Sequence, residues 1–240
     1  LGRTRHLQAF GRDHFDYVVV DEFHHASART YQQLLAHFNP RFLLGLTATP
    51  ERTDQSDILG LCDDNLVFNK DLFDGIEAKL LCPFSYQGIA DVIDYAEISW
   101  RNGRFDPEQL TNQLATRARA MHNFRYWQQH HQTRTLAFCI SKKHADFMAE
   151  DFIGQGVKAA SVHSDSTVLR NEALTQLRNG ELDVVFSVDL FNEGVDLPSI
   201  DTVLMLRPTE SKIIFLQQLG RGLRNSPNTN KDKPVVLDFI

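Results

Sequence analysis

The chain has 240 residues, of which 42% are hydrophobic and 23% are charged, and its formal net charge is −6 at pH 7. These values are typical of a soluble globular protein with a packed core, and no apolar run approaches the ~20 residues that a membrane-spanning helix requires. The negative charge disfavours a dedicated nucleic-acid-binding module, so any contact with a phosphate backbone has to come from a local groove.

The first residue and the cysteines indicate whether the chain is complete and in which compartment it lies. The sequence starts at Leu1 without an initiator methionine or a signal-like segment, and we therefore expect a piece of a longer protein. Its three cysteines are far apart, odd in number and flanked by apolar neighbours. We expect buried, reduced thiols and a cytoplasmic location.

The first predicted elements are two strands with a helix between them. Residues 15–20 form a short apolar run that is typical of a strand buried on both faces. The apolar spacing over 31–38 predicts a helix, and 42–46 is a second buried strand. From about 83 to 103 the pattern is blurred, and we interpret this stretch as a connector.

Strands and helices then alternate. A helical pattern covers 107–131, and a regular series follows it. Strands are predicted at 135–140, 157–162, 184–188, 202–206 and 235–239, and helices at 142–153, 168–177 and 211–219. This alternation predicts an α/β fold with parallel sheets covered by helices on both faces.

The first strand runs directly into Asp21 and Glu22, and two histidines, His24 and His25, follow at once. Ligands of parallel sheets bind at the carboxyl ends of strands. One interpretation is a nucleotide site, in which one carboxylate holds a hydrated Mg²⁺ and the other orients a water. A polar strand end without function is the second, and a zinc site is the third. The zinc site is disfavoured because neighbouring histidines do not share one face of a helix.

A second polar cluster lies in the segment FLQQLGRGLR, residues 215–224. Arg221 and Arg224 are three residues apart and flank Gly222. Two guanidinium groups so spaced can bind phosphoryl oxygens while charge shifts during transfer. The alternative is a basic helix end that interacts with its own carbonyl groups.

Together these clusters resemble the motifs of the superfamily 2 helicases and translocases. Residues 21–24 (DEFH) resemble motif II, 47–49 (TAT) motif III, and 217–224 motif VI. Residues 136–142 and 192–196 resemble motifs IV and V. The sequence of these motifs most resembles that of the type III restriction and excision-repair branch. The resemblance spans residues 16–224 and implies RecA-like sheets: part of a first domain over 1–73, a connector over 74–105 and a complete second domain over 106–240.

The resemblance also implies catalytic roles. Asp21 would hold the Mg²⁺ of ATP through water, and Glu22 would position the attacking water. Arg221 and Arg224 would act as arginine fingers on the phosphates. His24 would reach across a cleft to Gln217, which makes it a coupling residue and not a metal ligand.

Further positions follow from the same motifs. Thr47 and Thr49 would couple the nucleotide state to the nucleic-acid groove. Gly194 and Asp196 would bind the nucleotide, and Ser141, His163 and Ser187 would contact the sugar-phosphate backbone. Val188 stands where the DEAD-box RNA helicases carry threonine, which favours DNA over RNA as the partner.

A phosphate-binding loop ending in Gly-Lys-Ser/Thr is missing, because the sequence contains no Gly-Lys pair. We interpret this as an incomplete first domain, so that the chain alone is inactive. The alternatives are a non-hydrolysing helicase-like module that binds nucleic acid or a partner, and a metal hydrolase built on the DEFHH cluster. We expect no membrane partner, and self-association through the incomplete first domain.

Overall fold

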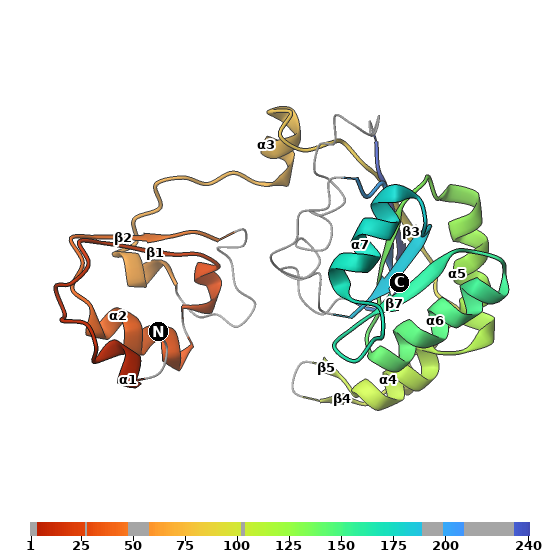
Figure 1. Ribbon diagram of the computed structural model, residues 1–240, viewed down its shortest axis with the longest axis horizontal. Helices are drawn as coiled ribbons and strands as arrows, with labels where there is room; N and C mark the ends of the chain where they lie inside the picture. The colour runs from red at the N-terminus through yellow and green to blue at the C-terminus, as the bar shows by residue number, and fades with distance from the viewer. Residues whose placement is uncertain (1–3, 27, 48–57, 102–103, 189–198, 209–232) are drawn as a thin grey trace. The chain divides into compact units, whose positions relative to one another are not determined.

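The structure, a computed structural model, describes residues 4–26, 28–47, 58–101, 104–188, 199–208 and 233–240 (Figure 1). The chain divides into two compact units, Leu1–Asn69 and Lys70–Ile240. None of the helices in the described part of the chain has the length and apolar character that crossing a bilayer requires.

The first unit is built on two parallel strands, β1 and β2, which are connected through helix α2. Tyr17 pairs with Phe42, and Val20 pairs with Gly45. The elements of this unit are α1 (Thr4–Leu7), β1 (Tyr17–Val20), η1 (Phe23–His25), α2 (Arg29–His37), β2 (Phe42–Gly45) and η2 (Leu59–Cys62).

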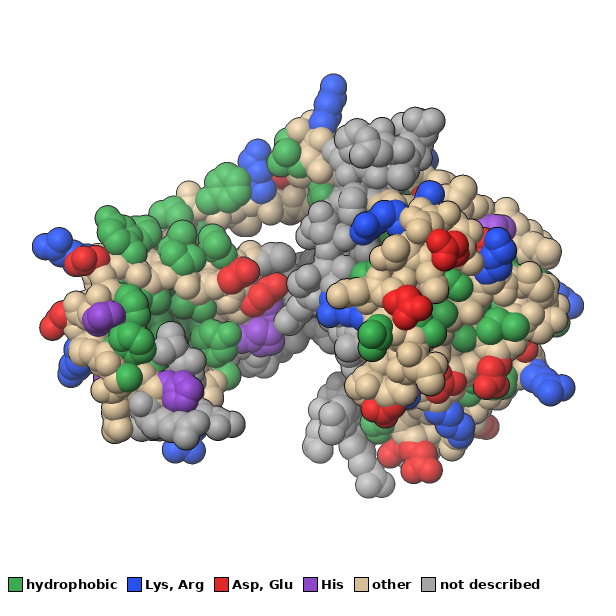
Figure 2. Space-filling model, viewed as in Figure 1, with side chains coloured by type: hydrophobic (Ala, Val, Ile, Leu, Met, Phe, Trp, Pro, Cys, Tyr) green, Lys and Arg blue, Asp and Glu red, His purple; other side chains and the backbone are tan. Residues whose placement is uncertain are grey.

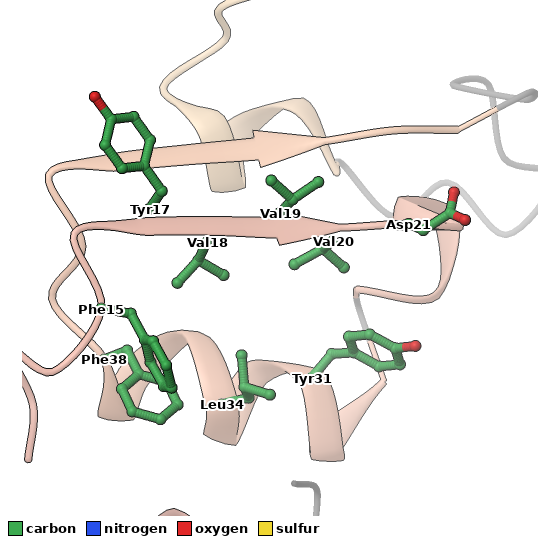
Figure 3. A pocket seen from close by; sticks show the side chains of 9 residues that line it. All are labelled: Phe15, Tyr17, Val18, Val19, Val20, Asp21, Tyr31, Leu34 and Phe38. Carbon is green, nitrogen blue, oxygen red and sulfur yellow. The ribbon is translucent and has the colours of Figure 1, made fainter. Parts of the chain in front are cut away.

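Helix α2 covers one face of this strand pair. Val18 and Val20 of β1 point towards the helix, whereas Tyr17 and Val19 point to the opposite side (Figure 3). Tyr17 and Val19 are 71% and 58% exposed, and Phe42 of β2 is 50% exposed. Figure 2 shows hydrophobic side chains gathered on the surface of this unit. The expected burial on both faces is therefore not met within the described residues, because a continuous apolar run does not reveal whether a second layer covers it.

A cavity of about 370 Å³ lies between β1 and α2 (Figure 3). Asp21 is the charged residue of its wall, and the remaining lining is apolar or aromatic: Phe15, Tyr17, Val18, Val19, Val20, Tyr31, Leu34 and Phe38. This cavity is open and mostly apolar, and it offers few groups that could bind phosphate.

The second unit contains a six-stranded sheet in the order β3-β10-β9-β6-β8-β7, and all of its strand pairs are parallel. Its strands are β3 (Ser85–Ile89), β6 (Thr135–Phe138), β7 (Ala159–Val162), β8 (Val184–Ser187), β9 (Thr202–Met205) and β10 (Val235–Phe239). The other elements are α3 (Leu72–Glu77), η3 (Tyr95–Glu97), β4 (Trp100–Arg101), β5 (Arg104–Phe105), α4 (Pro107–Leu114), α5 (Arg117–His130), α6 (Lys142–Gly154) and α7 (Arg170–Asn179).

Successive residues of the central strands belong to two separate cores. Ala137, Phe186 and Leu204 pack with α5 and α6 on one face of the sheet. Leu136 and Val203, each next in sequence to one of these, pack with α7 on the other. Because a strand alternates its side chains, an all-apolar run fills both cores. The predicted parallel sheet with helices on both faces is confirmed in this unit (Figure 1).

The stretch that was interpreted as a connector also contributes to this sheet. Strand β3 pairs in parallel with β10 along its whole length. Its sequence, SYQGI, is half polar because β3 is an edge strand with partly exposed side chains. Further on, the expected helix over 107–131 is two helices, because the backbone leaves the helical conformation at Ala115 and Thr116.

A buried ion pair ties this stretch to the sheet. Arg119 of α5 is 0% exposed, and its Nε and Nη2 donate to the carboxylate of Asp91 at 2.8–3.1 Å. Nη2 also donates to the carbonyl of Leu206 at 3.1 Å, and Nη1 lies 3.5 Å from His144 Nε2. Burial by itself would raise the pKa of Asp91, but the hydrogen bonds and charge of Arg119 outweigh it and lower that pKa.

Replacing Arg119 by methionine should lower the free energy of unfolding by about 3–5 kcal/mol, because Asp91 is left as a buried charge without its partner. Urea denaturation at pH 7 measures this change. Arg125→Met is the matched control, since Arg125 lies exposed on the same helix and should change stability by at most about 0.5 kcal/mol.

The difference between the native protein and Arg119→Met should also depend on pH. Because the folded-state pKa of Asp91 is lowered, its stabilisation is present above the unfolded pKa of about 3.9 and is lost as pH falls through the folded pKa. The stability deficit of the variant should therefore shrink in acid. A deficit that is the same at every pH would contradict the assigned ion pair.

Gly45→Ala should destabilise the first unit, because a Cβ at Gly45 would lie 2.5–2.8 Å from ring atoms of the buried Phe23. The overpacking should cost about 1–3 kcal/mol. Amide hydrogen exchange in β1 and β2, which measures the opening of this unit, should become faster. Gly11→Ala is the control, because a Cβ there has nothing within 4 Å, and equal exchange in both variants would contradict the packing.

Candidate strand-end site

The turn after β1 carries the two predicted carboxylates. Asp21 Oδ1 accepts a hydrogen bond from the backbone N–H of Glu22 at 2.9 Å. Glu22 has φ 51° and ψ 48°, a left-handed conformation that is uncommon for a residue with a side chain. Such a backbone costs on the order of 1–3 kcal/mol, and residues of this kind concentrate at functional sites.

This turn is fixed to the end of the neighbouring strand. The N–H of Phe23 donates to the carbonyl of Leu46 at 2.8 Å, and the N–H of Leu46 donates to the carbonyl of Val20 at 2.9 Å. The ring of Phe23 packs directly on Gly45, where a larger residue would not fit. The carboxylates of Asp21 and Glu22 are thereby held at the exposed carboxyl edge of the strand pair.

His24 connects the two strand ends through its side chain. It is 4% exposed, and its Nδ1 lies 3.2 Å from Thr47 Oγ1 and 3.4 Å from Glu22 Oε2. The ring of His25 lies beside it, tilted by 46°, with ring centroids 4.1 Å apart. The structure therefore brings together Asp21, Glu22, His24 and Thr47, which are four of the residues predicted from the sequence.

The donor atoms of this site suit magnesium better than zinc. Asp21 is exposed and provides a carboxylate oxygen, the kind of ligand that a hydrated Mg²⁺ takes in proteins. The Nδ1 of His24 already contacts Thr47 and Glu22. Across the described ranges, no group of three or more His, Cys, Asp or Glu side chains could hold a metal ion.

In the second unit, Ser141 follows β6 and caps helix α6. Its Oγ accepts a hydrogen bond from the N–H of His144 at 3.2 Å, and Thr111 Oγ1 of α4 lies 3.0 Å from the same oxygen. Lys143 Nζ donates to Asn112 Oδ1 at 2.8 Å. Helix α4 thus packs at the amino end of α6, beside the predicted nucleic-acid contact.

His163 follows β7 and is held by an aspartate on α6. The N–H of Asp165 donates to His163 Nδ1 at 3.2 Å, so Nε2 carries the proton and donates to Asp146 Oδ1 at 2.9 Å. Partial burial would raise the pKa of Asp146, but hydrogen bonds from Ser161 and His163 lower it. His163 is 9% exposed, so its ring is oriented within the fold and little of it is accessible.

Ser187 ends strand β8 and is fully buried. Its Oγ donates to the carbonyl of Ala137 at 3.1 Å. In this structure the hydroxyl is therefore hydrogen-bonded within the sheet and does not face solvent. The remaining predicted site residues lie outside the described residues: Thr49, Gly194, Asp196, Gln217, Arg221 and Arg224.

Sequence reasoning missed the residues that support these positions. The partners Asp91 and Arg119, and the contact of Thr111 with Ser141, join segments that are far apart in the chain and carry no motif. Asp146 was not singled out either. One signal was available: Asp106-Pro107 is a helix start, with Asp106 accepting hydrogen bonds from two N–H groups of α4.

Two family descriptions match the chain. The helicase conserved C-terminal domain matches residues 116–226, and the res subunit of type III restriction enzymes matches residues 2–52. The first match lies in the second unit and the second lies in the first unit. Each unit is thus matched to a helicase-related family independently.

Individual relatives agree with this assignment. IRC3 of Saccharomyces cerevisiae, which is assigned as an ATP-dependent helicase, is 27% identical over 247 residues, an alignment that covers 98% of this chain and 35% of IRC3. UvrABC system protein B of Thermosipho africanus is 40% identical over 98 residues, which are 38% of this chain and 15% of that protein. The chain therefore spans about a third of the length of IRC3.

Solved structures share the fold. A fragment of a protein assigned as the HsdR subunit of a type I restriction enzyme from Vibrio vulnificus has a TM-score of 0.78 at 24% identity, covering 98% of this chain and 45% of that one. The ATP-dependent type ISP restriction-modification enzyme LlaBIII, bound to DNA, has a TM-score of 0.62 at 16% identity, covering 94% and 18%. The two family matches and the alignment with IRC3 support an assignment to the superfamily 2 helicases of the restriction and repair branch, and the solved structures show that the chain shares their fold.

Proposed function

We propose that this chain is part of an ATP-dependent DNA helicase or translocase, in which hydrolysis of ATP is coupled to movement along or unwinding of nucleic acid. The observation that supports this function best is the turn at Asp21 and Glu22, because the Glu22 carboxylate contacts His24 and the same histidine contacts Thr47 at the next strand end. The left-handed backbone of Glu22 is consistent with a functional turn.

In this proposal Asp21 holds the hydrated Mg²⁺ of ATP with its exposed carboxylate. The ion supplies positive charge that neutralises the phosphates when it is bound. The hydrogen bond from the N–H of Glu22 to Oδ1 orients the carboxylate of Asp21. Its other oxygen accepts no such bond from this turn and is the one that faces a ligand.

Glu22 orients the attacking water and accepts its proton. Its side chain is 36% exposed, and Oε2 lies 3.4 Å from His24 Nδ1, so one oxygen is steadied by the histidine. A change in the charge or position of the Glu22 carboxylate alters its contact with His24. Because the same nitrogen of His24 contacts Thr47, that contact changes as well. This is a physical route by which the nucleotide state could reach the end of β2.

The other functional positions are proposed from the family motifs. Arg221 and Arg224 act as arginine fingers on the phosphates, Gly194 and Asp196 bind the nucleotide, and Gln217 contacts His24. DNA is the proposed partner, supported by the DNA-bound relative LlaBIII. The sequence has no Gly-Lys pair, so the 240 residues alone should hydrolyse ATP only at background rate, which would also be expected of a non-hydrolysing module.

In a protein that also carries the phosphate-binding loop, Glu22→Gln should lower ATP turnover by about 10²–10⁴-fold while leaving ATP binding intact. Thr47→Val should keep most of the basal turnover and lose its stimulation by DNA, because it removes the hydroxyl that contacts His24. Steady-state turnover with and without DNA, together with nucleotide affinity, measures both effects.

Asp64→Asn is the control for these variants. Asp64 is also an exposed carboxylate on a left-handed residue of the first unit, with φ 57°. It should leave turnover unchanged. Glu22→Gln with native turnover would show that the carboxylate does not take part in hydrolysis, whereas equal loss of basal and stimulated turnover in Thr47→Val would refute its coupling role.

Self-association of this 240-residue chain is proposed through the exposed face of β1 and β2. Val19→Lys should shift the sedimentation of the purified chain from dimer or larger to monomer, because a charge would replace an apolar side chain that is 58% exposed. Val92→Lys is the matched control, at 55% exposure in the second unit. A chain that sediments as a monomer without any substitution would exclude this surface.

A further inference from the structure

The segment from residue 91 to residue 116, which we call the cap segment, forms a small layer of its own on the second unit. It contains η3, the antiparallel pair β4–β5, and helix α4. Ile98, Leu110 and Leu114 are its buried core, and Ile140 at the end of β6 packs against them. The cap segment is therefore attached to the carboxyl end of a central strand of the sheet.

Trp100 of β4 is the unusual side chain of the cap segment, because it is 54% exposed. The other tryptophan of the chain, Trp127, is 4% exposed, and its Nε1 donates to Thr135 Oγ1. An indole has much to gain from burial, so most tryptophans are largely covered. An indole left half exposed on a folded hairpin is available to a ligand.

The backbone beneath Trp100 is well supported. Phe105, its partner in the strand pair, meets the indole edge to face with ring centroids 4.6 Å apart. The N–H of Asp106 donates to the carbonyl of Ser99 at 2.8 Å, and the N–H of Ser99 donates to Gln109 Oε1 at 2.9 Å. A ring that is already held in place loses little conformational entropy when a ligand binds to it.

The cap segment lies beside the predicted backbone contact of the second unit. Thr111 of α4 contacts the hydroxyl of Ser141, and Asn112 accepts a hydrogen bond from Lys143. At its beginning, Asp91 is held by the buried Arg119. A nucleic-acid strand that contacted Ser141 would therefore also lie close to helix α4 of the cap segment.

The cap segment contains five carboxylates, but several of them are already hydrogen-bonded, so they repel an anionic ligand less than five free carboxylates would. The carboxylate of Asp91 is paired with Arg119. The carboxylates of Asp94 and Asp106 accept hydrogen bonds from backbone N–H groups at the starts of η3 and α4. Glu97 and Glu108 remain exposed.

We propose that Trp100 is a stacking platform for a base of single-stranded nucleic acid. An exposed indole binds any base through its ring face, and base stacking on aromatic side chains is how proteins bind single strands without reading their sequence. The inference rests on the proposed function, since it deepens the account of the nucleic acid that this family member binds. It adds an aromatic contact to the polar contacts expected at Ser141.

The test measures binding of a fluorescein-labelled oligothymidylate to the 240-residue chain by anisotropy at low salt. Trp100→Ala should weaken binding by about tenfold or more, and Trp100→Phe should retain most of the affinity because an aromatic face remains. Ile153→Ala is the matched control: Ile153 is also 54% exposed, lies at the far end of α6, and should have no effect. Thermal melts verify that each variant is folded.

Two further measurements identify the contact as stacking. On an abasic strand of the same length, Trp100→Ala should bind as well as the native chain, because there is no base to stack. The nucleic acid should quench tryptophan fluorescence of the native chain, and the quenching should be lost in Trp100→Phe. Quenching that persists in Trp100→Phe would assign the signal to Trp127 and overturn the proposal.

The failures of the two proposals are distinguishable. If the native chain binds the oligonucleotide and Trp100→Ala binds it equally well, the stacking platform is wrong while nucleic-acid binding stands. An equal loss of affinity on the abasic strand would make the indole a structural residue and also overturn stacking. If the native chain binds neither strand, both the stacking platform and nucleic-acid binding by this chain fall.

Discussion

Parallel strand pairing is the constraint on which the rest of this structure depends. Because parallel strands end at the same edge, residues that follow different strands converge there although they are far apart in the chain. In the first unit this brings Thr47 after β2 to His24 after β1. In the second unit the same rule puts Ser141 and His163 at the carboxyl ends of β6 and β7. Each set of predicted site positions is a product of sheet topology.

The two units hold their strand ends by different physical means. In the first, a strained backbone at Glu22 is kept in place by backbone hydrogen bonds and by the packing of Phe23 on Gly45. In the second, a guanidinium is buried completely and satisfied by a carboxylate and a carbonyl. A buried charge pair contributes little net stability but penalises every arrangement in which its partners separate. Arg119 therefore specifies where the cap segment attaches.

The cap segment changes what the edge of the second unit offers to a ligand. A bare parallel sheet would present helix starts and short polar side chains at this edge. Here α4 lies beside Ser141, and the hairpin before it adds a supported indole. Polar contacts to phosphate are independent of sequence, and so is stacking on an aromatic ring. The proposed stacking contact would therefore be as independent of sequence as the polar contacts are.

Much of this protein could be read from local sequence. Apolar runs predicted five strands of the six-stranded sheet, and helical spacing predicted α6 and α7, because those signals repeat over a few neighbouring residues. The helix predicted over 211–219 lies outside the described residues. The pair Asp21-Glu22 was identified for the same reason: its residues are adjacent. Strand β3 was missed, since an edge strand need not be apolar, and the partners of His24, Ser141 and Arg119 were missed because no local pattern records them. Those contacts join residues 23, 30 and 28 positions apart, and only the packing of the folded chain decides which side chains meet over such separations.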